Sequence, residues 1–117
     1  MAGRVVYFSG EFVPERDANV SIFDCALMYG DMAFEMTRTF AGTPFKLREH
    51  LERLYGSLRL LEIDCGLTID EMEEQTLLTL EKNRSTEEDG IWEKRRSELT
   101  NTACSTESLR QSTTVGV

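Results

Sequence analysis

The first third of the chain contains short β-prone runs separated by turn residues. Two such runs flank Ser9-Gly10, which predicts a hairpin that opens the domain. Apolar and polar residues partly alternate over residues 32–40, which predicts a strand. The turn residues 41–44 follow it and lead to residues 45–47, so we expect a second hairpin there.

The pattern then changes to helical spacing. Leucines recur every three or four residues and predict an amphipathic helix of about four turns; they are Leu47, Leu51, Leu54, Leu58 and Leu61. A second helix is expected from Thr68, where Thr-Ile-Asp-Glu forms a capping box, to about residue 83. Together these elements predict an α+β fold, with a small antiparallel sheet and two helices packed on one of its faces.

Residues 84–117 have no sustained period. They contain eleven Ser or Thr residues and few large apolar ones. Such a composition buries too little apolar surface to offset the entropy of ordering the chain. We therefore expect two regions, a folded domain over residues 1–83 and a Ser/Thr-rich tail of low order over residues 84–117.

Composition excludes several classes of function. The net charge of -8 and the pI near 4.7 argue against a nucleic-acid partner, because phosphate backbones select clusters of Lys and Arg. Three widely spaced cysteines and a single histidine suggest neither a disulfide framework nor a metal site. No apolar run approaches the length of a membrane span, so we expect a soluble protein of the reducing cytoplasm.

Arg38 conflicts with its surroundings. The two-residue period of a strand places it on one face with Phe34, Met36 and Phe40. A charged side chain on an apolar face needs a partner or an open edge, and such conflicts often mark functional sites. Structural pairing of Arg38, for example with Glu35, is an equally good interpretation.

A second candidate cation lies on the predicted leucine helix. His50, Arg53 and Ser57 form a stripe beside the leucines, at the boundary between core and solvent, where a partly desolvated arginine can hold an anion. The alternative is an exposed ion pair between Arg53 and Glu49.

The order and spacing of these groups carry more information than any one of them. Reading along the chain, they are Tyr29-Gly30-Asp31, Phe34-Glu35, Arg38, Pro44-Phe45 and His50-Leu51-Glu52-Arg53-Leu54 with Ser57. Together they resemble the N-terminal small domain of class IV aminotransferases, the pyridoxal-phosphate enzymes of fold type IV. That family includes branched-chain amino acid aminotransferases, D-amino acid aminotransferases and aminodeoxychorismate lyase, and the resemblance covers roughly residues 5–83.

The resemblance implies roles for four residues. Arg53 matches the arginine that binds the phosphate of pyridoxal 5'-phosphate, for which a bidentate guanidinium is well suited. Tyr29, Phe34 and Arg38 match positions that line the substrate pocket. The Phe-Glu-x-x-Arg form is closer to the branched-chain group, whose members transfer an amino group from an amino acid to a 2-oxo acid, and intact relatives are expected to be homodimers.

The resemblance also implies what to expect of the lysines. Complete relatives carry the Schiff-base lysine on a second, larger domain, and none of Lys46, Lys82 and Lys94 matches that lysine. We therefore assign no catalytic residue and expect the chain alone to be inactive.

Several interpretations stay open. The chain is either a truncated or frame-altered fragment of an aminotransferase or of an aminodeoxychorismate lyase-like enzyme, or a non-catalytic association module built on the same domain. A further alternative is that a separate chain supplies the lysine. Translating the gene beyond residue 83 in its other two frames discriminates between fragment and module.

Overall fold

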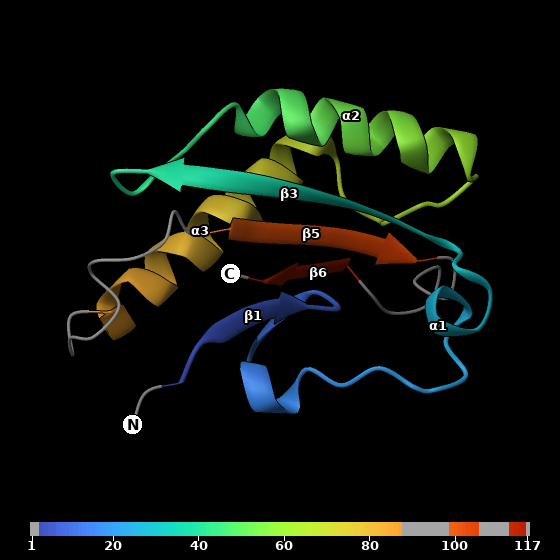
Figure 1. Cartoon of the computed structure of the whole chain (residues 1–117), viewed down its shortest axis with the longest axis horizontal. Coiled ribbons are helices and arrows are strands. Elements are labelled where there is room, and N and C mark those ends of the chain that lie inside the picture. Colours follow the sequence, from blue (N-terminus) through green and yellow to red (C-terminus); the bar gives the residue numbers. More distant parts are fainter. Residues whose placement is uncertain (1–2, 88–98, 106–112, 117) are drawn as a thin grey trace.

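A six-stranded antiparallel sheet organises the molecule (Figure 1). The computed structural model describes residues 3–87, 99–105 and 113–116. The strand order is β2-β1-β6-β5-β3-β4, and every described pair is antiparallel. The strands are β1 (Val5–Phe8), β2 (Glu11–Pro14), β3 (Met32–Phe40), β4 (Thr43–Pro44), β5 (Leu99–Ser105) and β6 (Thr113–Gly116).

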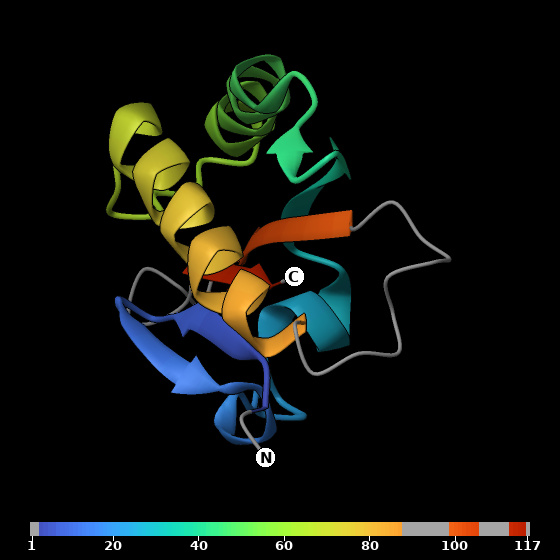
Figure 2. The same cartoon turned by 90° about the vertical axis from the view of Figure 1, so that its left-hand side faces the viewer.

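Two long helices cover one face of this sheet. They are α2 (Leu47–Leu60) and α3 (Ile69–Glu87), and Figure 2 shows them together on one side, with the short α1 (Cys25–Tyr29) on the other. A single 3-10 turn, η1 (Glu15–Asp17), follows β2. The predicted α+β class is thereby confirmed. Among the described residues, no helix combines the length and apolar character that crossing a membrane requires.

Tight turns connect both hairpins. Ser9 and Gly10 have φ values of 53° and 88°, a left-handed pair that joins β1 to β2 as predicted. Ala41 and Gly42 repeat this geometry with φ values of 50° and 72°, which pairs Phe40 with Thr43 directly after the turn. The second hairpin strand therefore lies at Thr43–Pro44, and the prediction of a strand over residues 45–47 is wrong.

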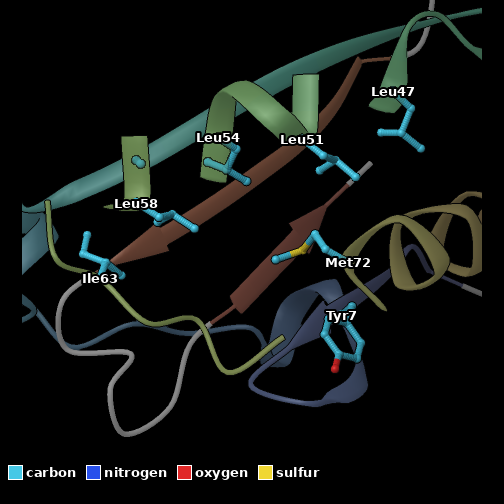
Figure 3. Packing of buried hydrophobic residues seen from close by; sticks show 8 residues of the cluster. Tyr7, Leu47, Leu51, Leu54, Leu58, Ile63 and Met72 are labelled. Carbon is cyan, nitrogen blue, oxygen red and sulfur yellow. The ribbon is translucent and has the colours of Figure 1, made fainter. Parts of the chain in front are cut away.

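The leucine stripe of α2 forms the core. Leu47, Leu51, Leu54 and Leu58 are buried and face the sheet, where Met72 of α3 and Tyr7 of β1 meet them (Figure 3). Leu61 does not continue the stripe as expected. It caps α2 and is 46% exposed, because the chain turns away there and Ile63 enters the core instead.

The start of α3 follows the predicted capping box. The backbone N–H of Thr68 donates to the Glu71 carboxylate at 2.7 Å, and the Glu71 N–H donates to the Thr68 hydroxyl at 3.3 Å. The pKa of Glu71 is lowered first by the backbone N–H of Thr68 and then by the Thr68 hydroxyl, which donates to the same carboxylate oxygen at 2.9 Å. The helix continues four residues beyond the expected end at residue 83, to Glu87.

Two strands fall within the stretch that was expected to have low order. In the structure β5 pairs with β3 over residues 32–38, and β6 pairs with β5 and β1. Neither strand has an apolar period of its own, so their place depends on pairing with β3 and β1. Residues 88–98, 106–112 and 117 lie outside the described residues, and the division of the chain at residue 83 stays a prediction.

Strand β3 has two contrasting faces. Its inner face, beneath α2, is buried and largely polar; it consists of Ala33, Glu35, Thr37 and Thr39. Its outer face is exposed and carries the predicted set of Phe34, Met36, Arg38 and Phe40. The period predicted for this strand is therefore confirmed, but the apolar face is the exposed one and the polar face is the buried one.

Candidate functional site

An ion pair joins β3 to α2 at the centre of the candidate site. Glu35 lies on the inner face of β3, and its side chain is only 10% exposed. Arg53 reaches it from α2, donating from Nε to Oε1 at 2.5 Å and from Nη2 to Oε2 at 2.7 Å. Two parallel charge-assisted hydrogen bonds fix both the position and the plane of the guanidinium.

His50, one turn before Arg53 on α2, completes the cluster. Its Nδ1 lies 2.9 Å from Glu35 Oε2 and 3.2 Å from Arg53 Nη2. An ionised carboxylate only accepts hydrogen bonds, so Nδ1 carries the proton and donates it to Glu35. In that tautomer, the contact with Arg53 joins two donors and is a close approach only.

The charges of this cluster are coupled. The pKa of Glu35 is lowered to about 2, chiefly because its carboxylate accepts hydrogen bonds from Arg53; burial opposes this effect, and the His50 contact adds to it. The pKa of Arg53 is raised, first by the hydrogen bonds to Glu35 and then by its charge. Glu35 and Arg53 are thus both ionised at neutral pH.

The guanidinium presents its outer edge to solvent. The side chain of Arg53 is 68% exposed, although its partner Glu35 is buried. Within the described part of the chain, its contacts involve Nε and Nη2 and none involves Nη1. The outer edge of the guanidinium is therefore available to an anion.

The other candidate residues lie elsewhere on the sheet. Phe34 and Arg38 share the outer face of β3, where Phe34 is 58% exposed. Tyr29 ends α1 and is 76% exposed, and Gly30 closes that helix with a φ of 74°. Phe34 and Arg38 thus lie on the same face of β3, whereas Arg53 lies on the opposite side of this strand.

Neither pairing alternative is found in the structure. Glu35 does not pair with Arg38, because neighbours at odd spacing in a strand point to opposite faces. Arg53 pairs across to Glu35 and not along its helix to Glu49. Sequence reasoning placed His50 beside Arg53 and considered Glu35 only as a partner of Arg38, so it missed that these residues meet in one cluster. The signal for Glu35 was present, since the same period that groups Phe34 with Arg38 turns Glu35 toward the helices.

Two lysines belong to the described residues, and both lie near aromatic rings. Lys46 Nζ is 5.7 Å from the centre of the Phe45 ring, and Lys82 Nζ is 4.8 Å from that of Phe12. The third, Lys94, lies outside the described residues. Within the same part of the chain, no group of three His, Cys, Asp or Glu residues could hold a metal ion.

Known proteins with similar sequences agree on one family. The model of the family described as "Amino-transferase class IV" matches residues 32–106. A putative branched-chain-amino-acid aminotransferase of Methanocaldococcus jannaschii is 49% identical over 78 residues, which are 67% of this chain and 27% of that protein. A D-alanine aminotransferase of Staphylococcus epidermidis is 37% identical over 78 residues, 67% of this chain and 28% of that protein.

Solved structures agree as well. The branched-chain amino acid aminotransferase of T.th., in complex with N-(5'-phosphopyridoxyl)-L-glutamate, superposes with a TM-score of 0.76 at 25% identity, covering 99% of this chain and 40% of that one. By sequence, the chain spans little more than a quarter of the length of the two aminotransferases of Methanocaldococcus jannaschii and Staphylococcus epidermidis. On the family match over residues 32–106 and on this fold, the chain belongs to the class IV aminotransferases.

Proposed function

We propose that this chain is the small, phosphate-binding domain of a pyridoxal-phosphate-dependent aminotransferase. The observation that carries the proposal is the guanidinium of Arg53, whose Nε and Nη2 are held by a buried carboxylate while the side chain as a whole is 68% exposed. Arginine suits phosphate because its planar fork makes two parallel hydrogen bonds. In this domain Arg53 would hold the phosphate of the cofactor.

The residues present fit one part of the cofactor. The outer N–H donors of Arg53 suit the phosphate group of the cofactor. Pyridoxal phosphate, when bound, supplies the electron sink for amino-group transfer. The lysine that anchors the cofactor is not assigned to Lys46, Lys82 or Lys94, since none of them matches the family's catalytic lysine in its sequence context. We propose that the lysine comes from a larger domain, in the same polypeptide or in a second chain.

An open strand edge gives a ligand access to both sides of β3. On one side β3 pairs with β5, and on the other, among the described strands, it pairs with β4 only at Thr39 and Phe40. We propose that the ligand lies along this edge over residues 32–38, with its phosphate toward Arg53 and its substrate end toward Phe34 and Arg38.

The substrate we propose is an amino acid with an apolar, branched-chain-like side chain, which exchanges its amino group with a 2-oxo acid. Phe34 and Tyr29 would shape the pocket, and Arg38 or the Tyr29 hydroxyl would bind the substrate carboxylate. The higher identity to the branched-chain relative, 49% against 37% for the D-alanine enzyme, favours this class.

The outer face of the sheet also requires a covering partner. Phe34, Met36 and Phe40 are between 46% and 58% exposed there. Contiguous exposed apolar groups mark interaction surfaces. We propose that the lysine-bearing domain covers this face in a homodimeric enzyme of the cytoplasm.

The phosphate role of Arg53 can be tested on the chain itself. Pyridoxamine 5'-phosphate lacks the aldehyde and forms no Schiff base with lysine, so a titration followed by NMR reports non-covalent binding. We expect Arg53→Gln to lose on the order of 1.5 to 3 kcal/mol of binding free energy, about 10- to 150-fold in affinity. Arg53→Lys should recover part of this loss, because it keeps the charge but not the fork.

Pyridoxamine without its phosphate is the matched control and should bind the parent and the Arg53 variants equally. Equal affinity of the parent and Arg53→Gln for the phosphorylated ligand, with folding intact, would return Arg53 to a purely structural role.

A second candidate function is non-catalytic association. The exposed apolar outer face favours it as well, because a binding module needs such a surface whether or not a cofactor is present. A chain that assembles normally but binds no pyridoxamine 5'-phosphate would support association over the enzyme.

A further inference from the structure

We propose that Glu35 is a positioning residue, which holds the guanidinium of Arg53 with its outer edge turned to the incoming anion. This inference rests on the proposed phosphate role of Arg53 and adds to it a second residue, on a different element. The alternative is that Glu35 competes with the anion for Arg53, and the two roles predict opposite effects when the carboxylate is removed.

The pattern of contacts separates these roles. Glu35 engages Nε and Nη2, the inner edge of the fork, with one carboxylate oxygen for each nitrogen. Within the described residues, Nη1 makes no contact, so two donors on the outer edge stay available while the pair is intact. A phosphate can therefore bind Arg53 without displacing Glu35.

The difference in burial makes Glu35 the anchor and Arg53 the held group. The Glu35 side chain is 10% exposed and lies on a strand between the buried residues Ala33 and Thr37, so its carboxylate has little freedom. Arg53 is 68% exposed, and a long side chain with that freedom samples many rotamers when nothing holds it. Fixing it before the anion arrives reduces the entropy cost of binding.

His50 supports the same geometry from the helix. Its Nδ1–H donates to Glu35 Oε2, the oxygen that also accepts from Arg53 Nη2. This third donor further restrains the carboxylate on the side that faces α2. The outer edge is left as the side from which an anion can approach.

The test measures the affinity of the full chain for pyridoxamine 5'-phosphate in the parent, Glu35→Gln and Glu52→Gln. Each variant removes one negative charge, which by itself favours an anion. Glu52 is the matched control, because it lies beside Arg53 on α2, is 61% exposed and pairs instead with Arg48 at 3.7 Å. We expect Glu35→Gln to bind about tenfold more weakly than the parent, and Glu52→Gln to bind at least as well as the parent.

A spectroscopic readout separates positioning from general loss of structure. In the parent, the Nε–H of Arg53 should exchange slowly with solvent and keep its signal when phosphate is added, since Glu35 still binds it. In Glu35→Gln this proton should exchange faster, while the amide signals of the core stay in place. Should that variant fail to fold, Glu35→Asp keeps the charge and shortens the reach, and it should also bind more weakly.

The outcomes also separate this inference from the proposed function. Weaker binding by Arg53→Gln together with unchanged or tighter binding by Glu35→Gln would overturn positioning and leave the phosphate role of Arg53 intact. Of these two results, only tighter binding would show competition. Equal binding by the parent and Arg53→Gln, or no binding by the parent, would overturn both.

Discussion

At the scale of single residues, Glu35 is an acid buried on the inner face of a strand, and its partners make that position tolerable. Burial disfavours the ionised form of a carboxyl group, so a buried carboxyl group without a partner has a raised pKa and binds a proton more readily. Arg53 and His50 reverse that tendency, and the pKa falls to about 2 from an ordinary value of 4.5. The ion pair therefore links the stability of the sheet and α2 to pH.

The sign of this linkage is fixed by the lowered pKa. Glu35 contributes stability at pH values above about 4.5, and this contribution is lost as the pH falls toward 2, where the folded carboxylate also binds a proton. We expect the parent to exceed Glu35→Gln by about 1 to 2 kcal/mol in free energy of unfolding at pH 7, since the exposure of Arg53 weakens the pair.

Urea unfolding of both proteins between pH 7 and pH 2 measures this gap. Other carboxyl groups titrate in both proteins and cancel in the difference. A gap that stays constant over this range would exclude an ionised Glu35 as its source.

At the scale of elements, one buried side chain ties the end of α3 to the first strand. Asn83 is 3% exposed; its Oδ1 accepts from the backbone N–H of Val5, and its Nδ2 donates to the carbonyls of Val5 and Thr79, all at 2.8 Å. The amide thus substitutes for a neighbouring strand at Val5. It fixes where the helix lies along the sheet.

Replacing this amide should loosen α3 from the sheet. Asn83→Ala leaves the polar backbone of Val5 without that partner, and we expect a loss of about 1 to 3 kcal/mol in free energy of unfolding, measured with urea. Asn19→Ala is the matched control, because Asn19 is exposed and its side-chain amide donates to the Arg16 carbonyl at a long distance of 3.4 Å. Equal midpoints for the two variants would contradict a structural role for Asn83.

At the scale of the whole molecule, the sheet has one covered and one open face. The helices bury the leucine stripe against the inner face, while the apolar outer face of β3 stays exposed. Sheets whose two faces differ in this way gain stability from a partner on the open side. The proposed larger domain meets this physical requirement.

The contribution of residues 88–117, which make up most of the predicted tail, can be measured directly. A shortened chain that ends at residue 87 lacks β5 and β6. If these residues form a tail of low order, the unfolding midpoint should be unchanged, and limited proteolysis should cut there first. If the pairing of β5 with β3 contributes to stability, the midpoint should fall by several degrees, because β3 and β1 each lose a neighbouring strand.

The sequence by itself determined the features that depend on near neighbours. Left-handed turn residues set the first hairpin, the two-residue period defined Met32–Phe40, and helical spacing with a capping box defined α2 and the start of α3. The order of the motif along the chain was enough to indicate the family, since it joins residues within one stretch.

Only the tertiary structure decided which groups meet across the sheet. Arg53 could pair with Glu49 on its own helix, yet it pairs with Glu35, 18 residues away, because the leucine stripe turns that side of α2 toward the inner face of β3. The same packing placed Phe34 and Arg38 on the opposite face from Arg53. The sequence period predicts on which face of its own helix or strand a side chain lies. Which residues that face contacts depends on how the separate helices and strands pack against each other.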